Sequence, residues 1–286
     1  MHDEFRENSS ALALRTGKAI EELLAPRRQR FRKLFIAALG SVPWVGGLLA
    51  GLDSLRDQED QETTNDLHRE WLEEHLRKFQ RVGQTLGEIV ERLEEFGQET
   101  QARIESEEYL ALVRKAFRAW DAVDTEEKRD LLRKLLANAG ASTVDPDDLV
   151  RLFIEWIETY HEAHFQVVRA IYRNPRTTRA AIWDLIHGTP VREDSAEADL
   201  FKLLVRDLST GGVIRQARKT DLEGRFLRRP SQARRAGTPY MKSAFDDADE
   251  YVLTELGEKF VHFAMDELVP RVSGSRKADQ RDPDGK

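Results

Sequence analysis

Residues 34–52 read LFIAALGSVPWVGGLLAGL, an uncharged run of 19 residues in a chain where 34% of the residues are charged. As one helix rising about 1.5 Å per residue, the run would extend roughly 28 Å, close to the thickness of a bilayer's hydrocarbon core. Basic residues precede it and acidic residues follow it, so its two ends carry opposite charge. The run is therefore a candidate for either a buried core segment or a membrane segment.

Glycine and proline within the run argue against one continuous helix, because both residue types disfavour helix interiors. The residues concerned are Gly40, Pro43, Gly46, Gly47 and Gly51. We expect a break within residues 41–47, which leaves two apolar arms, LFIAAL and LLAGL, folded into a hairpin. Neither arm is long enough to span a bilayer alone. A permanent anchor is also disfavoured because the basic flank would stay in the cytoplasm while about 230 residues crossed the membrane.

Three interpretations of the run remain open: a buried corner in the chain's own core or in an oligomer, a segment that inserts conditionally into a membrane, and a constitutive anchor. The residues expected to contact a membrane or an oligomer partner are Leu34, Phe35, Ile36, Leu39, Val42, Trp44, Val45, Leu48, Leu49 and Leu52. The preceding cluster RRQRFRK is either a solvated helix end or a site for anionic lipid head groups. Its cations are Arg27, Arg28, Arg30, Arg32 and Lys33.

The whole chain of 286 residues has 40% hydrophobic residues, a formal net charge of -7 and no cysteine. This acidic balance disfavours a protein that coats nucleic acid along its whole surface. Without cysteine there are no disulfides and no thiolate sites, and the redox compartment stays undetermined. The polar N-terminus MHDEFRENSS does not resemble a secretory signal, so we expect a cytoplasmic protein with peripheral or conditional association with the inner membrane.

Helical periodicity dominates the chain and predicts a mainly α protein. We expect five regions along it. These are an N-terminal helix with the apolar glycine-rich hairpin (1–53), a long coiled-coil-like helix (54–105), a helical bundle (106–160), a winged-helix domain with a small β-hairpin (161–270) and a disordered tail (271–286).

The long helix is predicted from a seam of apolar residues spaced alternately three and four apart, the pattern of a coiled coil. The seam comprises Phe79, Val82, Leu86, Ile89, Leu93, Phe96 and Thr100. In the bundle, we expect helices over 109–123 and 125–139, the second capped by Asp124 or Thr125, and Pro146 in the first turn of a third helix.

The C-terminal region has the order expected of a winged helix. Helices are predicted over HFQVVRAIYRN, TRAAIWDLI and DLFKLLVRDL, followed by strands VIRQARK and GRFLRR joined through TDLEG, and by a closing segment YVLTELGEKFVHFAMDEL. Nine cations and two carboxylates lie within residues 215–242, a local charge of +7. The residues expected to contact nucleic acid or a partner are Arg215, Arg218, Lys219, Arg225, Arg228, Arg229, Arg234 and Arg235.

The helix that would enter a DNA groove, ADLFKLLVRDL, is acidic and apolar and carries only Lys202 and Arg206 as cations. Sequence-specific base reading is therefore disfavoured. Non-specific nucleic-acid contact, protein interaction or self-association, and a merely solvated basic loop remain as alternatives.

Motifs for catalysis are lacking, since the sequence holds no phosphate-binding P-loop, no nucleophile elbow and no HExxH. His161 and His164 have a spacing that suits metal ligands on one helix, but a third ligand is not evident, so we expect structural histidines. We predict no enzyme, no catalytic residue, no cofactor and no metal.

Three motifs carry a resemblance to a known family: the basic, glycine-broken apolar segment, EKRDLLRKLLANAG followed by VDPDDLV, and the closing YVLTELGEKF. Together they resemble small helical proteins of bacterial abortive-infection and phage-defence systems, including the Abi-alpha type. The resemblance implies a bacterial protein that acts on a membrane after a trigger. Likeness to winged-helix proteins further implies that Thr254 caps the closing helix and that Gly257 permits close packing.

The favoured function is a non-enzymatic defence-type effector or adaptor that oligomerises and inserts its apolar hairpin into the inner membrane on activation. One alternative is a cytoplasmic winged-helix regulator that binds DNA, or an adaptor that binds protein. Another is a coiled-coil scaffold. The expected partners are a second copy of the chain, an anionic membrane surface, and a protein or non-specific nucleic acid at the basic wing.

Overall fold

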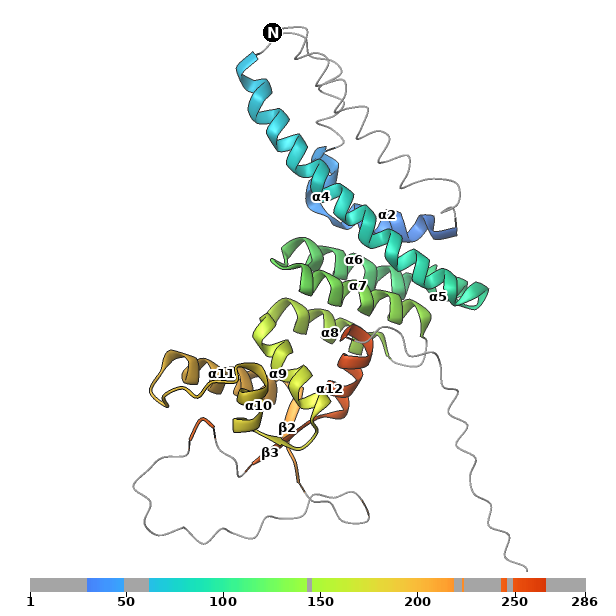
Figure 1. Cartoon of the computed structure of the whole chain (residues 1–286). Helices are drawn as coiled ribbons and strands as arrows, with labels where there is room; N and C mark the ends of the chain where they lie inside the picture. The colour runs from blue at the N-terminus through green and yellow to red at the C-terminus, as the bar shows by residue number, and fades with distance from the viewer. Residues whose placement is uncertain are drawn as a thin grey trace, which may run out of the picture.

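The computed structural model describes residues 30–48, 62–142, 146–218, 223, 243–245 and 249–265. Within these ranges the protein is mainly helical, with one three-stranded antiparallel sheet. Figure 1 shows the elements stacked in layers, with α2 and α4 above the pair α6 and α7, and the sheet with α9 to α12 below α8. The expected helix before Arg30 and the expected disordered tail lie outside the described residues.

The apolar run begins as helix α2 (Arg32–Ser41) and breaks at Val42, which has an extended backbone. Helical structure resumes at Pro43 and continues to Leu48, where the described part of the run ends. Proline suits the first position of a helix because its missing N–H would have no intrahelical partner there. The predicted break within residues 41–47 is confirmed.

The long helix α4 (Glu62–Glu95) is followed by a 3-10 turn (Gly97–Thr100) and the short α5 (Gln101–Ile104). The prediction of one helix reaching residue 105 is wrong because Gly97 takes φ +69°, a left-handed conformation that ends helices. Five residues of the predicted seam are buried where α4 packs against α7 of the same chain: Phe79, Val82, Leu86, Ile89 and Leu93. The seam thus forms a contact between two helices of the same chain.

The helical bundle is confirmed and consists of α6 (Glu107–Ala122), α7 (Glu126–Ala141) and α8 (Asp147–Thr159). Of the two predicted caps for α7, Thr125 is the one used, since its side chain accepts a hydrogen bond from the Lys128 amide. Pro146 stands just before α8 as its N-cap instead of within its first turn. Every residue of α7 from Leu135 to Ala141 is buried.

The C-terminal part places three short strands among four helices. Its elements are α9 (Glu162–Arg173), β1 (Thr177–Thr178), α10 (Arg179–Ile186), α11 (Ala196–Thr210), β2 (Ile214–Gln216), β3 (Glu250–Leu253) and α12 (Glu255–Phe260), which continues as a π-helix (Val261–Met265). The strand order is β1-β3-β2, with Ile214 opposite Leu253 and Thr177 opposite Tyr251. The predicted strand GRFLRR lies outside the described residues, and β2 pairs with β3.

The roles expected for Thr254 and Gly257 are both found at the start of α12. The Thr254 hydroxyl accepts a hydrogen bond from the Gly257 amide at 3.0 Å and donates one to the Gly212 carbonyl at 2.6 Å. A Cβ atom on Gly257 would lie 2.2 Å from the carbonyl oxygen of Val213. The closing helix can therefore approach β2 only because residue 257 has no side chain.

The π-helix joins the C-terminal part to the bundle through Asn138 of α7. The Asn138 side-chain amide donates to the Phe263 carbonyl at 2.8 Å. Asn138 is buried, so this hydrogen bond directly links the interior of the bundle to the π-helix.

Gly257→Ala is expected to lower the free energy of unfolding by about 1–3 kcal/mol, because the backbone of β2 must move to accept the methyl group. Gly40→Ala is the matched control, since a Cβ on Gly40 meets nothing within 4 Å. The control should be neutral or stabilising by up to about 1 kcal/mol. Urea unfolding followed by circular dichroism measures both, and equal effects would contradict this account of Gly257.

Candidate functional site

The first candidate site is the apolar run itself, whose helix α2 packs mainly against α6, while Trp44 and Gly47 lie against His75 and Trp71 of α4. Five of its large side chains are at most 7% exposed: Leu34, Phe35, Val42, Val45 and Leu48. Leu39 and Trp44 are partly buried against the same core, while Leu49 and Leu52 lie outside the described residues. The run is thus sheltered by the chain that carries it.

Burial of a large apolar side chain stabilises by about 1.5–3 kcal/mol, so these five contribute roughly 8–15 kcal/mol of gross apolar burial. This gross gain disfavours exposure of the run to water in the resting protein. Another apolar environment, such as a bilayer or a second protein surface, would offer the same burial.

Trp44, in the middle of the run, contacts both α6 and α4. Its indole Nε1 donates a hydrogen bond to the Asp121 carboxylate of α6 at 2.7 Å. Its ring meets His75 of α4 edge-on, with ring centres 5.4 Å apart, and His75 stacks on Trp71 at 4.0 Å. The break at Val42 is therefore followed at once by an anchored residue.

The basic flank is tied to the turn between α4 and α5. Arg30 donates to the Gly97 carbonyl at 2.6 Å and also to the Gln101 side chain, and Lys33 Nζ lies 3.3 Å from the Glu105 carboxylate. Hydrogen bonds from Gln101 and Lys33 lower the pKa of Glu105. Arg32 is exposed, whereas Arg27 and Arg28 lie outside the described residues. Two of the predicted lipid-contacting cations thus have protein partners.

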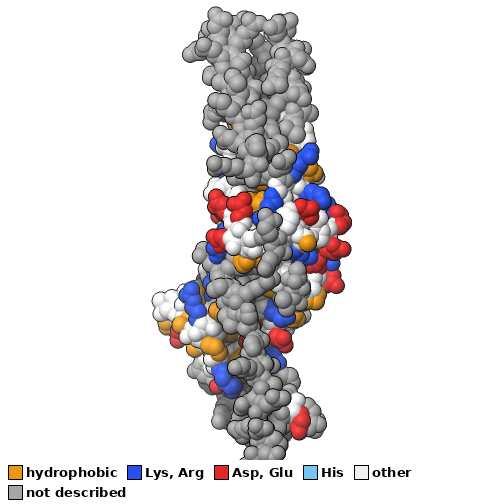
Figure 2. Space-filling view, turned by 90° about the vertical axis from the view of Figure 1, so that its right-hand side faces the viewer, with side chains coloured by type: hydrophobic (Ala, Val, Ile, Leu, Met, Phe, Trp, Pro, Cys, Tyr) orange, Lys and Arg blue, Asp and Glu red, His pale blue; other side chains and the backbone are white. Residues whose placement is uncertain are grey.

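The outward face of the run carries Ile36, which is 58% exposed. Gly40, Pro43, Gly46 and Gly47 are also exposed. Figure 2 shows the side of the molecule at the right of Figure 1, where acidic and basic side chains intermix over the described residues. Among the described residues, no helix has the length and apolar character needed to cross a membrane.

The second candidate site is the basic segment 215–242, and of its predicted contact residues only Arg215 and Arg218 are described, both exposed. Lys219, Arg225, Arg228, Arg229, Arg234 and Arg235 lie outside the described residues.

On α11, Lys202 Nζ lies 3.5 Å from the Asp199 carboxylate, and Arg206 Nε lies 3.5 Å from that of Asp207. Both cations of α11 are therefore balanced by acids on the same helix, while Leu200 and Leu203 are exposed.

His161 and His164 lie at the start of α9 and are joined there by a hydrogen bond. His164 Nδ1 accepts a hydrogen bond from the His161 amide at 3.1 Å, and its ring stacks on Tyr160 at 4.9 Å between ring centres. Burial lowers the pKa of His164, although Asp207, whose carboxylate lies 3.9 Å from Nε2, opposes that shift. The described residues contain no group of three side chains that could hold a metal ion.

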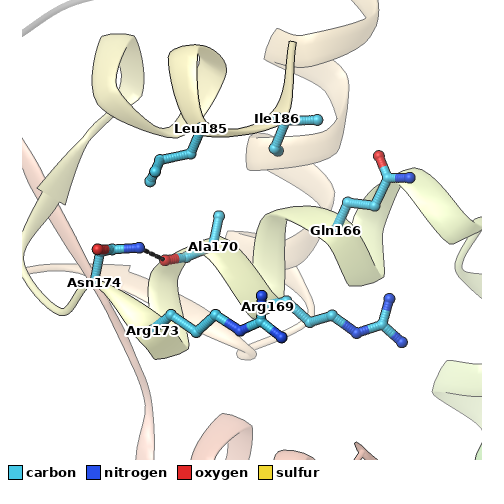
Figure 3. A pocket seen from close by; sticks show the side chains of 7 residues that line it. All are labelled: Gln166, Arg169, Ala170, Arg173, Asn174, Leu185 and Ile186. Atoms are coloured by element: carbon cyan, nitrogen blue, oxygen red, sulfur yellow. Dashed lines mark hydrogen bonds between the residues drawn. The ribbon is translucent and has the colours of Figure 1, made fainter. Parts of the chain in front are cut away.

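A third candidate is a pocket of about 290 Å³ between α9 and α10 (Figure 3). It is lined by Gln166, Arg169, Ala170, Arg173, Asn174, Leu185 and Ile186. Arg169 also donates to the Glu127 carboxylate of α7 at 2.6 Å. The pocket combines guanidinium and amide groups with an aliphatic wall.

No protein-family model, curated protein or solved structure compared with the chain matches it. The resemblance to abortive-infection proteins therefore stays a prediction based on the motifs alone.

Sequence reasoning missed the partners of Trp44 and the α9–α10 pocket. Trp71 and His75 are four residues apart, so helical periodicity alone places them on one face of α4. No local signal links them to Trp44, and none links Trp44 to Asp121, 77 residues away. The pocket was missed because Arg169 and Arg173 resemble the ordinary solvated face of a helix.

Trp44→Phe is expected to lower the free energy of unfolding by about 0.5–1.5 kcal/mol, because an aromatic ring remains at this position while the hydrogen bond to Asp121 is lost. Asp121→Asn keeps an acceptor oxygen and should cost less. Urea denaturation of both variants measures the difference. A larger loss for Asp121→Asn than for Trp44→Phe would contradict the proposed hydrogen bond.

Stability is expected to fall on acidification through about pH 6.5, the ordinary pKa of an unfolded histidine. Below that pH the unfolded chain binds a proton that the buried His164, whose pKa is lowered, does not. His164→Asn retains an acceptor for the His161 amide and should weaken this dependence. Asp207→Asn should strengthen it. Urea midpoints between pH 7.5 and 5.5 test both, and identical slopes in all three proteins would refute the assignment to His164.

Proposed function

We propose that the chain is a non-enzymatic effector that stores an apolar segment, residues 34–52, and transfers it to a membrane after a trigger. The observation that carries the proposal is that an uncharged segment, whose helix breaks at Val42, is buried against other helices of its own chain. A bilayer offers the segment the same apolar burial as these helices, so moving the segment exchanges one favourable environment for another. The sheltered state corresponds to the resting protein.

The polar contacts of the segment and its basic flank can also be replaced by contacts with a membrane. Arg30 and Lys33 bind a carbonyl, an amide and a carboxylate in the resting state, and anionic lipid head groups offer each cation about 1 kcal/mol near a membrane surface. Trp44 bonds Asp121, and tryptophan is favoured at the membrane–water interface. Arg30, Lys33 and Trp44 therefore have an interaction partner both in the resting protein and at a membrane surface.

The C-terminal part is proposed to be a winged helix that receives the trigger. The order α9-β1-α10-α11-β2-β3-α12 and the antiparallel sheet β1-β3-β2 support this fold. Asn138 couples it to the bundle, so a change at the π-helix reaches α7 directly. The resemblance to Abi-alpha proteins supports antiviral defence at the bacterial inner membrane as the setting, with homo-oligomers as the active form.

Ile36→Asp tests the membrane step without disturbing the resting fold. Ile36 is 58% exposed, so the substitution should leave the unfolding midpoint unchanged. In a bilayer the same carboxylate would cost about 2.5–3.5 kcal/mol. We expect the wild type to release dye from phosphatidylethanolamine and phosphatidylglycerol vesicles at high protein concentration, and Ile36→Asp to release far less.

Two matched variants complete this test. Ile36→Leu keeps an apolar side chain, and Gln80→Glu adds one negative charge at an exposed position of α4; both should leak like the wild type. Absence of leakage by the wild type across protein concentrations, salt and pH, or equal leakage by Ile36→Asp, would refute the proposal.

A second candidate, a winged-helix adaptor that binds protein, is favoured by α11. Its exposed Leu200 and Leu203 and its paired cations suit a protein surface better than a DNA groove. Salt-dependent binding to duplex DNA, lost in the combined change Arg228→Ala and Arg229→Ala, would instead favour the DNA-binding alternative.

A further inference from the structure

The α9–α10 pocket has an aliphatic wall and a cationic rim. Ala170, Leu185 and Ile186 supply the wall, and Leu185 is 54% exposed although it is a large apolar side chain. Arg169 and Arg173 stand one helical turn apart on α9, and Figure 3 shows both along the same side of the pocket. Such a site suits a ligand that presents aliphatic groups beside carboxylates.

A surface with that chemistry lies on α11. Leu200 and Leu203 are 50% and 39% exposed and stand three apart, so they share one face of the helix. Glu197 and Asp199, in the first turn, are exposed beside them. This face therefore offers the leucines and the carboxylates that the pocket requires.

The α11 of the same chain is already committed to its own fold. It packs on α9, and its buried residues Phe201, Val205 and Leu208 lie on another face. Its exposed leucines are left for a different molecule. We propose that the α9–α10 pocket of one copy receives the α11 face of a second copy of this chain.

The pairing joins two unlike surfaces, and each copy carries both. Heterologous contacts of this kind close into a ring when the rotation between copies allows it, and otherwise extend as an open chain. Either assembly gathers several N-terminal segments. The contact itself needs neither a membrane nor release of the apolar run, so it can hold where the proposed function fails.

Charge reversal tests the pairing in the full-length chain by analytical ultracentrifugation. Arg173→Glu reverses a charge of the pocket and leaves α11 intact, whereas Asp199→Lys reverses a charge of α11 and leaves the pocket intact. Each variant alone should associate at least about tenfold more weakly than the wild type. In an equimolar mixture, the intact pocket of Asp199→Lys receives the intact α11 of Arg173→Glu, and the reversed pocket meets the reversed helix, so association should recover.

Three controls keep the outcome decisive. Arg118→Glu reverses the same charge at an exposed position of α6 and should associate like the wild type. Leu185→Asp alone should weaken association, and mixing it with Asp199→Lys should restore only the contact between the intact pocket of Asp199→Lys and the intact α11 of Leu185→Asp, so that pairs form but longer assemblies do not. Circular dichroism should be unchanged in all variants, since each altered residue is exposed.

A wild type that stays monomeric at all accessible concentrations would overturn the proposal. So would association that both reversals leave unchanged, because another surface would then form the assembly. Binding of a fluorescent acidic, leucine-containing peptide to a monomeric wild type would assign the pocket to a different protein and would equally exclude the second copy.

Discussion

The buried C-terminal half of α7 is the constraint on which the other elements depend. Every residue from Leu135 to Ala141 is buried, and α7 packs against α4, α6, α8 and the π-helix. Helices can approach it from every direction only where its residues are small, as at Ala137, Ala139 and Gly140. A Cβ on Gly140 would lie 2.8 Å from atoms of Leu93 and Tyr109. The N-terminal layer and the C-terminal part therefore share one rigid element.

The apolar run differs from an ordinary core helix in how it is held. Its buried face is fully apolar, while its polar contacts come from the basic flank and from Trp44. Its outward face is glycine-rich, and side chains at Gly40 and Gly46 would meet nothing within 4 Å. Packing of the resting fold does not require these glycines, which lower helix stability. They are compatible with a segment selected for a second environment.

Features set by neighbouring residues were predictable from the sequence. The break at Val42 and the Thr125 cap each depend on a few adjacent side chains, and the roles of Thr254 and Gly257 were implied by the likeness to winged-helix proteins. The end of α4 was missed because the apolar spacing continues past Gly97, although its positive φ ends the helix. The pairing of β2 with β3 and the bond from Trp44 to Asp121 were missed because they join segments distant in the sequence. The burial of the run was one of several alternatives until its partners were known.

The break at Val42 also determines how much membrane the run could occupy. The part of the run that lies in α2, residues 34–41, extends about 12 Å, less than half the thickness of a hydrocarbon core. An inserted segment with a bend at this point would reside in one leaflet and enlarge its area relative to the opposite leaflet. Several copies side by side would accumulate this imbalance as curvature stress. A short, bent segment can thereby weaken a bilayer without crossing it.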